Sequence, residues 1–279
     1  KECPPPSLLN SSNRETNSRF QSSLLALAVL STFALPVAAQ DYTFEGTDHK
    51  QIAEDILEAG LTSSDNLSVS YTGNDSYYGA ALASQSAIDI TVNNLTAHSS
   101  QKGIATKEPD QNITINASGN VEITSIQAAI HSASDSERGS GAVTINAAGD
   151  VILRSTGGFA VHGNTSGNIT INADGRFEAY SMSGISNTST GNLTVNAQSV
   201  LIDTEEHYGV VSLGAGDLTV TAEEDISITN HNSEGTAVEA RSSGTLTLDA
   251  GRSTIVTGNI KTKNDATIDI DFNGSGSVF

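Results

Sequence analysis

The segment Gly167-Asn-Ile-Thr-Ile-Asn-Ala-Asp-Gly175 contains the pattern that decides the fold. Its Ile-Thr-Ile-Asn core alternates apolar and polar residues, so an extended chain places Ile169 and Ile171 on one face and the polar side chains on the other. The Ala-Asp-Gly that follows is typical of a tight turn, where glycine supplies backbone angles that other residues avoid. The segment therefore predicts a half-buried β-strand that ends at a corner.

The same phrase recurs along the chain as an apolar residue, Thr or Asp, a second apolar residue, and then Asn, Thr or Asp. Successive phrases are 22 to 30 residues apart, counted on the second position. A period in the twenties with uneven steps is typical of a solenoid with loop insertions. The phrases are Ile90–Asn93, Ile113–Asn116, Val143–Asn146, Ile169–Asn172, Leu193–Asn196, Leu218–Thr221, Leu246–Asp249 and Ile268–Asp271.

Two further segments follow each phrase. The first is a second alternating strand after the turn, as in Ala117–Ile123 and Ala173–Ala179, and the second is a short piece of Gly, Ala and Val, as in Gly209–Val211. We therefore predict an all-β, parallel β-solenoid with three short strands per coil, about seven coils and roughly 4.8 Å between stacked strands. A chain with 37% hydrophobic residues and no Trp has little material for a globular core, but it suffices for a coil that buries small and β-branched side chains.

One helix is expected, from Asp48 to Gly60, with Ile52, Ile56 and Leu57 on its apolar face. Asp48 is a suitable N-cap and Gly60 a suitable stop. We expect this helix to cover the open N-terminal end of the solenoid, which would otherwise expose core and strand edge. The predicted organisation is a signal peptide with an extended n-region at 1–39, an N-terminal cap at 40–66 and β-helix repeats at 67–279.

The predicted signal peptide has three parts. Arg14 and Arg19 precede an apolar run at Leu24–Leu35, and small residues follow, so we expect cleavage after Ala39. The run is short for a transmembrane helix, and an uncleaved anchor is the alternative. Because the chain begins with Lys1 rather than Met and stops inside the repeats, we expect it to belong to a longer protein.

The chain is strongly acidic. Its formal charge is −19, and residues 1–39 carry three basic and two acidic groups, which leaves −20 for the remainder. This charge argues against nucleic acid or an anionic membrane surface as a partner. It fits either solubility alone or a cation-dependent surface.

With a signal peptide, no cysteine after Cys3, and phrases such as Gly167–Gly175 and Gly191–Ala197, the chain resembles passenger domains of bacterial autotransporters. The resemblance covers roughly residues 41–279. It implies a right-handed parallel β-helix that is exported through a C-terminal outer-membrane barrel of the same protein and displayed on a Gram-negative cell surface. Two-partner secreted haemagglutinins share the solenoid and are the second family that the phrases resemble.

No catalytic, cofactor-binding or metal-binding residue is predicted. The Gly-Asp-Ser-Gly motif of serine-protease passengers does not occur. Two sets of residues are candidates for chemistry. One is acidic, is expected to lie close together on successive coils, and is either a group of solvated corners or a carboxylate site: Glu205, Glu206, Glu223, Glu224 and Asp225. The other is the pair His131 and His162, either outward-facing residues or a metal pair or pH-sensitive contact, expected to stack in a column that continues as Ser186, Ser212 and Glu239.

The function that the resemblance implies, together with the lack of catalytic motifs, is adhesion or cell aggregation without catalysis. The binding surface would be the long polar side of the β-helix or the inserted loops Ala97–Gln111 and Ser132–Ser140, and the partners would be glycans or proteins of host or bacterial surfaces, or a second copy. Asn-x-Thr sequons at Asn112, Asn168 and Asn192 follow from the repeat itself. A secreted carbohydrate-active β-helix enzyme and a structural stalk for a distal domain are the alternatives.

Overall fold

The computed structural model describes residues 39–272, except 76–78, 85–86, 107–110, 133–140, 165, 189 and 242. The predicted signal peptide, apart from Ala39, lies outside these residues. Within the described ranges, no helix has both the length and the apolar character needed to cross a membrane.

The repeated phrase forms the first of three parallel sheets. Its strands pair in register without a shift, so each phrase stacks on the equivalent residues of its neighbours. The strands are β4 (Ile88–Val92), β7 (Ile113–Ala117), β10 (Val143–Ala147), the beginnings of β12 (Ile169–Asn187) and β13 (Leu193–Thr204), β15 (Leu218–Ala222), β18 (Thr245–Ala250) and β21 (Thr267–Phe272).

The second sheet contains the alternating strand that follows each phrase. It consists of β1 (Asp41–Gly46), β2 (Asn66–Tyr71), β5 (Asn94–Ser99), β8 (Val121–Ser125), the beginning of β11 (Val151–Gly163), the middle of β12, the end of β13, β16 (Asp225–Asn230) and β19 (Ser253–Thr257). Because β1 pairs in register with β2, the second sheet already begins within the 40–66 range expected to be a cap.

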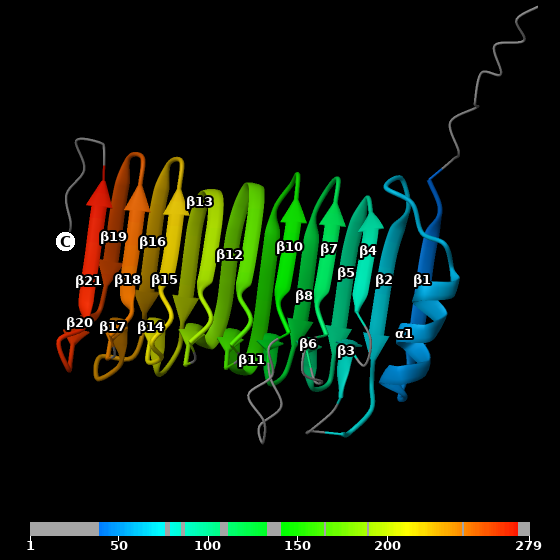
Figure 1. Cartoon of the computed structure of the whole chain (residues 1–279), viewed down its shortest axis with the longest axis horizontal. Helices are drawn as coiled ribbons and strands as arrows, with labels where there is room; N and C mark the ends of the chain where they lie inside the picture. Colours follow the sequence, from blue (N-terminus) through cyan, green and yellow to red (C-terminus); the bar gives the residue numbers. More distant parts are fainter. Residues whose placement is uncertain are drawn as a thin grey trace, which may run out of the picture. The chain divides into compact units, whose positions relative to one another are not determined.

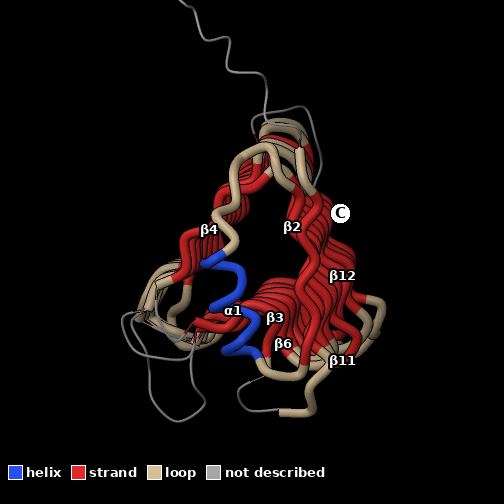
Figure 2. The backbone as a smooth tube through the Cα atoms, turned by 90° about the vertical axis from the view of Figure 1, so that its right-hand side faces the viewer, coloured by secondary structure: helices blue, strands red, loops and turns tan. Residues whose placement is uncertain are grey.

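The third sheet contains the short segments rich in small residues. It consists of β3 (Ala80–Ser84), β6 (Lys102–Thr106), β9 (Ala128–Ser132), the ends of β11 and β12, β14 (Tyr208–Ser212), β17 (Thr236–Ala240) and β20 (Asn259–Thr262). Figure 1 shows the coils stacked side by side, and Figure 2 shows the three sheets as the sides of a triangular section. The predicted parallel solenoid is confirmed, with about eight turns rather than seven.

The core runs through the inside of the coils as columns of like residues. Ile115, Ile145 and Ile171 pair strand to strand and are fully buried, and the columns beside them are similarly apolar. Their polar neighbours point outward, because successive side chains of a strand point to opposite faces. The core is therefore continuous from coil to coil, as the repeat pattern predicts.

Helix α1 (His49–Glu58) lies across the N-terminal end of the coils in Figure 2 and contacts β1 and β3. The Asp48 side chain accepts a 2.9 Å hydrogen bond from the Lys50 amide, and Gly60 has a φ of +64°. Ile52 and Ile56 are buried as predicted, but Leu57 is 48% exposed, so its place on the buried face was wrong. Residue 57 follows residue 56 by about 100° around the helix, which turns it away from the coil.

The expected loop Ala97–Gln111 is also wrong for most of its length. Ala97 is a buried residue of β5, and Lys102–Thr106 form β6, all five residues of which are buried. This strand was missed because it has no apolar–polar alternation. Ser132 ends β9, and the rest of the second expected loop, 133–140, lies outside the described residues.

Candidate ligand-binding face

The outer surface of the first sheet carries two parallel columns of uncharged polar side chains. Over β7, β10, β12, β13 and β15, every outward position of the phrase is Thr or Asn, in a chain with a net charge of −19. Carboxylates appear in these columns only outside those five strands, at Asp89, Asp249, Asp269 and Asp271. We call the outward residues of the five strands the Thr–Asn face: Thr114, Asn116, Thr144, Asn146, Thr170, Asn172, Thr194, Asn196, Thr219 and Thr221.

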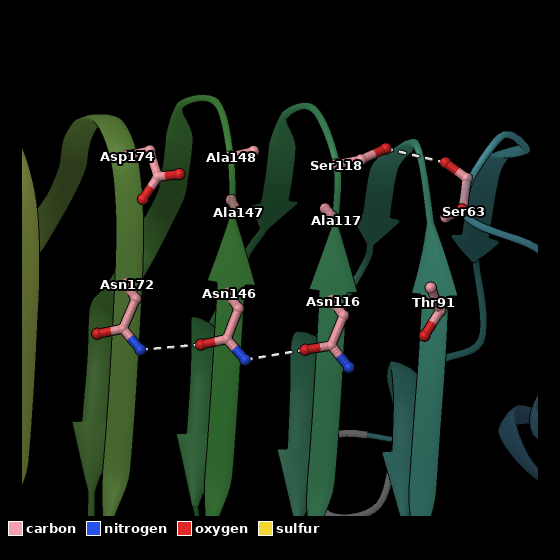
Figure 3. A pocket seen from close by; sticks show the side chains of 10 residues that line it. All are labelled: Ser63, Thr91, Asn116, Ala117, Ser118, Asn146, Ala147, Ala148, Asn172 and Asp174. Atoms are coloured by element: carbon pink, nitrogen blue, oxygen red, sulfur yellow. Dashed lines mark hydrogen bonds between the residues drawn. The ribbon is translucent and has the colours of Figure 1, made fainter.

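The four asparagines form a directional hydrogen-bonded ladder. Asn146 Nδ2 donates to Asn116 Oδ1 at 2.9 Å, Asn172 to Asn146 at 2.8 Å, and Asn196 to Asn172 at 2.8 Å. Figure 3 shows the first two of these bonds. A carboxamide has two N–H groups and two oxygen lone pairs, so each ladder member keeps hydrogen-bonding capacity for a ligand after bonding its neighbours.

A groove follows the ladder along the corner between the first and second sheets. One part, about 430 Å³, is lined by Asn116, Asn146 and Asn172 and by the turn residues Ser118 and Ala148, which lie closer to the turns in Figure 3. A second part of about 330 Å³ extends over Asn196 to Thr221 and Glu223, and both parts are lined by Asn172 and Asp174.

The groove exists because alanine occupies the last position of each phrase strand. Ala117, Ala147, Ala173 and Ala197 stack in register and are buried with the phrase isoleucines, and these small residues line the floor of the groove beside the outward-facing asparagines. At the N-terminal end, Ser118 Oγ donates to the Ser63 carbonyl at 2.9 Å. Alanine follows almost every phrase in the sequence, but this pattern predicts a turn and not a groove.

The five acidic residues do not form one site. Glu205 and Glu206 follow the second-sheet end of β13, whereas Glu223, Glu224 and Asp225 lie at the corner between β15 and β16. The two sets are thus at opposite ends of the second-sheet strands, and the expectation that they lie near one another was wrong. Arg252 pairs with Glu224 at 2.9 Å and Asp225 at 2.6 Å. The hydrogen bond from Ser253, together with Arg252, holds the pKa of Asp225 below its usual range.

His131 and His162 stack in register as predicted, with ring centroids 5.1 Å apart. Phe159 stacks on His162 at 4.7 Å. His131 points away from the core as predicted, although it is buried. One detail of the prediction was wrong, since the column continues through Ser186, Val211 and Glu239, because Ser212 pairs with Asn187. Among the described residues, no group of three or more His, Cys, Asp or Glu side chains is placed to hold a metal ion.

The asparagines of the three sequons have a structural role at the corner that precedes each phrase. Asn112 accepts a hydrogen bond from the Ala142 amide at 2.9 Å, and Asn168 accepts one from the Asn192 amide at 3.0 Å. Asn192 accepts one from the Asp217 amide at 3.0 Å. These bonds connect neighbouring coils, so the repeat needs a side-chain acceptor at this corner.

An ionic cluster that the sequence pattern does not predict lies on the outer face of the third sheet. The side chain of Glu239 is 1% exposed and accepts hydrogen bonds from Arg241, while Lys263 Nζ lies 3.5 Å away. Burial raises the pKa of the Glu239 carboxyl, but Arg241 and Lys263 outweigh burial and hold this pKa below its usual range. Arg241 also donates to the Tyr208 hydroxyl at 3.2 Å.

No protein-family model matches the chain, and the chain matches neither a curated protein nor a solved structure. The chemistry of the Thr–Asn face therefore has to be inferred from its own side chains.

Proposed function

We propose that this chain is the recognition region of an exported, surface-displayed protein of the autotransporter passenger type, and that it acts in adhesion or cell aggregation without catalysis. The observation that carries the proposal is the Thr–Asn face. It offers a long, uncharged, hydrogen-bonding surface on a backbone held in register by three sheets. Such a surface suits binding through many weak, repeated contacts.

The positions of the acidic residues support a role without catalysis. Hydrolysis of glycosidic bonds requires two carboxyl groups within about 5–10 Å of each other across the scissile bond. The two acidic sets considered for that chemistry lie at opposite corners of the coil. At one corner, Arg252 and Ser253 hold the carboxylates in a structural network.

Expression of the full-length gene in a Gram-negative host tests the proposal. The test variant carries Thr144→Lys and Thr194→Lys on the Thr–Asn face. The control carries Thr124→Lys and Thr229→Lys, which are half-buried threonines on the outer face of the second sheet. Both variants change the charge equally, and surface labelling establishes that both are exported.

We expect the face variant to lose sedimentation or surface binding and the control to keep it. If the two variants adhere equally well while both reach the surface, adhesion does not depend on this face. Retained adhesion after deletion of residues 41–279 would leave the segment as a stalk.

A further inference from the structure

We propose that the groove beside the asparagine ladder binds a linear, neutral glycan whose chain runs along the solenoid axis. This inference rests on the proposed function, since it names the ligand class of the same face. It adds a site, a direction and a charge preference that the general proposal does not contain.

The length and direction of the groove fit an extended chain. Its lining residues run from Thr91 on β4 to Thr221 on β15, and in-register pairing makes these the ends of one column. Five strand spacings of about 4.8 Å give a length of roughly 24 Å. Equivalent groups recur at every spacing, so a polymer with a similar repeat meets the same contacts at each unit.

The side chains around the groove match the two kinds of surface that a sugar presents. The remaining N–H and oxygen capacity of Asn116, Asn146 and Asn172 suits hydroxyl groups, which both donate and accept. On the other side, the exposed methyl group of Ala148 provides apolar contact for the C–H face of a sugar ring. Ligand sites commonly combine such apolar walls with a few fixed polar groups.

Charge selects against acidic glycans. Asp174 and Glu223 stand at the groove, and no basic side chain is among its described lining residues. The net charge of −19 adds long-range repulsion. The carboxylates of Asp174 and Glu223 would therefore repel the negative charges of a sulfated or uronate-rich chain.

A polypeptide fits the groove less well than a sugar chain. Extended peptides gain affinity mainly by adding a strand to a free sheet edge. The backbone groups of the strands beside this groove are already paired on both sides, as in β10, which lies between β7 and β12. The groove offers side-chain amides and methyl groups rather than an open edge.

Two variants of the full chain test the inference. Ala148→Trp fills the groove from an exposed position, and Ile126→Trp is its control, because Ile126 is 51% exposed at the corner between β8 and β9. Asn172→Thr interrupts the ladder with a residue that occupies the equivalent position naturally at Thr91 and Thr221. The probes are immobilised neutral β-linked hexose oligosaccharides of increasing length, with heparin as the acidic comparison.

We expect binding of neutral oligosaccharides to strengthen with length up to about five sugars, one for each strand spacing. Ala148→Trp should weaken it at least about tenfold, or by 1.4 kcal/mol, Asn172→Thr should weaken it less, and Ile126→Trp should leave it unchanged. Preference for heparin, or neutral binding that survives Ala148→Trp, overturns the inference. Absence of all glycan binding also overturns it, and the Thr→Lys adhesion assay then decides separately whether the face is an adhesive surface.

Discussion

The asparagine ladder has a direction, and this direction predicts different costs for the same substitution at its two ends. Within the ladder, Asn116 only accepts a hydrogen bond and Asn196 only donates one. Aspartate accepts but cannot donate when ionised. Asn116→Asp therefore keeps the native bond, whereas Asn196→Asp loses it and places a carboxylate against the Asn172 oxygen.

The expected difference in stability between the two variants comes mainly from one hydrogen bond. Loss of the 2.8 Å bond from Asn196 to Asn172 should cost about 0.5–1.5 kcal/mol, and repulsion between the facing oxygens adds to this cost. At Asn116 the retained bond becomes charge-assisted and stronger. We therefore expect Asn196→Asp to be less stable than Asn116→Asp by about 1–2 kcal/mol, or roughly 2–8 °C in Tm for a domain of this size.

Urea unfolding of both variants at neutral pH measures this difference, with the m-value showing whether both unfold in the same cooperative step. The net-charge change is identical in the two variants, so each is the control for the other. Equal costs, or a larger cost for Asn116→Asp, would refute the direction of the ladder.

Three further predictions concern other parts of the fold. Ile171→Ala, at a fully buried site, should cost about 2–5 kcal/mol in chemical unfolding, while Ile255→Ala, at a 46% exposed site, should change stability by less than about 0.5 kcal/mol; similar costs would contradict the assigned strand faces. Glu239→Gln should cost about 1–2 kcal/mol at pH 7, discounted for the one-third exposure of Arg241. The folded state lowers the pKa of Glu239, so the stabilisation by its carboxylate is present above the unfolded pKa and is lost as pH falls through the folded pKa. The free energies of unfolding of wild type and variant should therefore converge in acid. A constant difference between them down to about pH 2 would be contrary evidence. Asp48→Ala should cost about 1 kcal/mol by removing the N-cap of α1, and thermal unfolding unchanged by this variant would show that the cap does not stabilise the coil end.

The first and second sheets could be predicted from the sequence because one face of each strand is buried and the other is not. Alternation then appears directly in the letters, as in Val143–Ala147 and Val121–Ser125. In-register stacking repeats this signal, because the inward columns carry apolar residues from coil to coil. The repeat period and the number of strands per coil could be predicted for the same reason, since each alternating segment marks one strand.

The third sheet gave no comparable signal, because both faces of strands such as β6, β9 and β17 are buried. His131, Ser186 and Glu239 point away from the core, yet all three are at most 5% exposed. Polarity therefore does not indicate which way a side chain points, and the sequence does not predict the strand at Lys102–Thr106. The groove could not be predicted for a different reason, since a hollow depends on how the turn residues pack beside the column of asparagines.

The absence of charge on the Thr–Asn face leads to a last prediction, on the salt dependence of adhesion. Salt at 1 M shortens the screening length to about 3 Å and weakens binding that depends on exposed charge pairs. Amide and hydroxyl contacts are little affected, so adhesion through this face should change less than about twofold between roughly 0.1 M and 1 M NaCl. The exposed cations Lys261 and Lys263, near the C-terminal end of the third sheet, are the contrasting surface. If adhesion instead falls steeply with salt, and Lys261→Gln with Lys263→Gln reproduces the fall, an anionic partner binds there and the Thr–Asn face is not the adhesive surface.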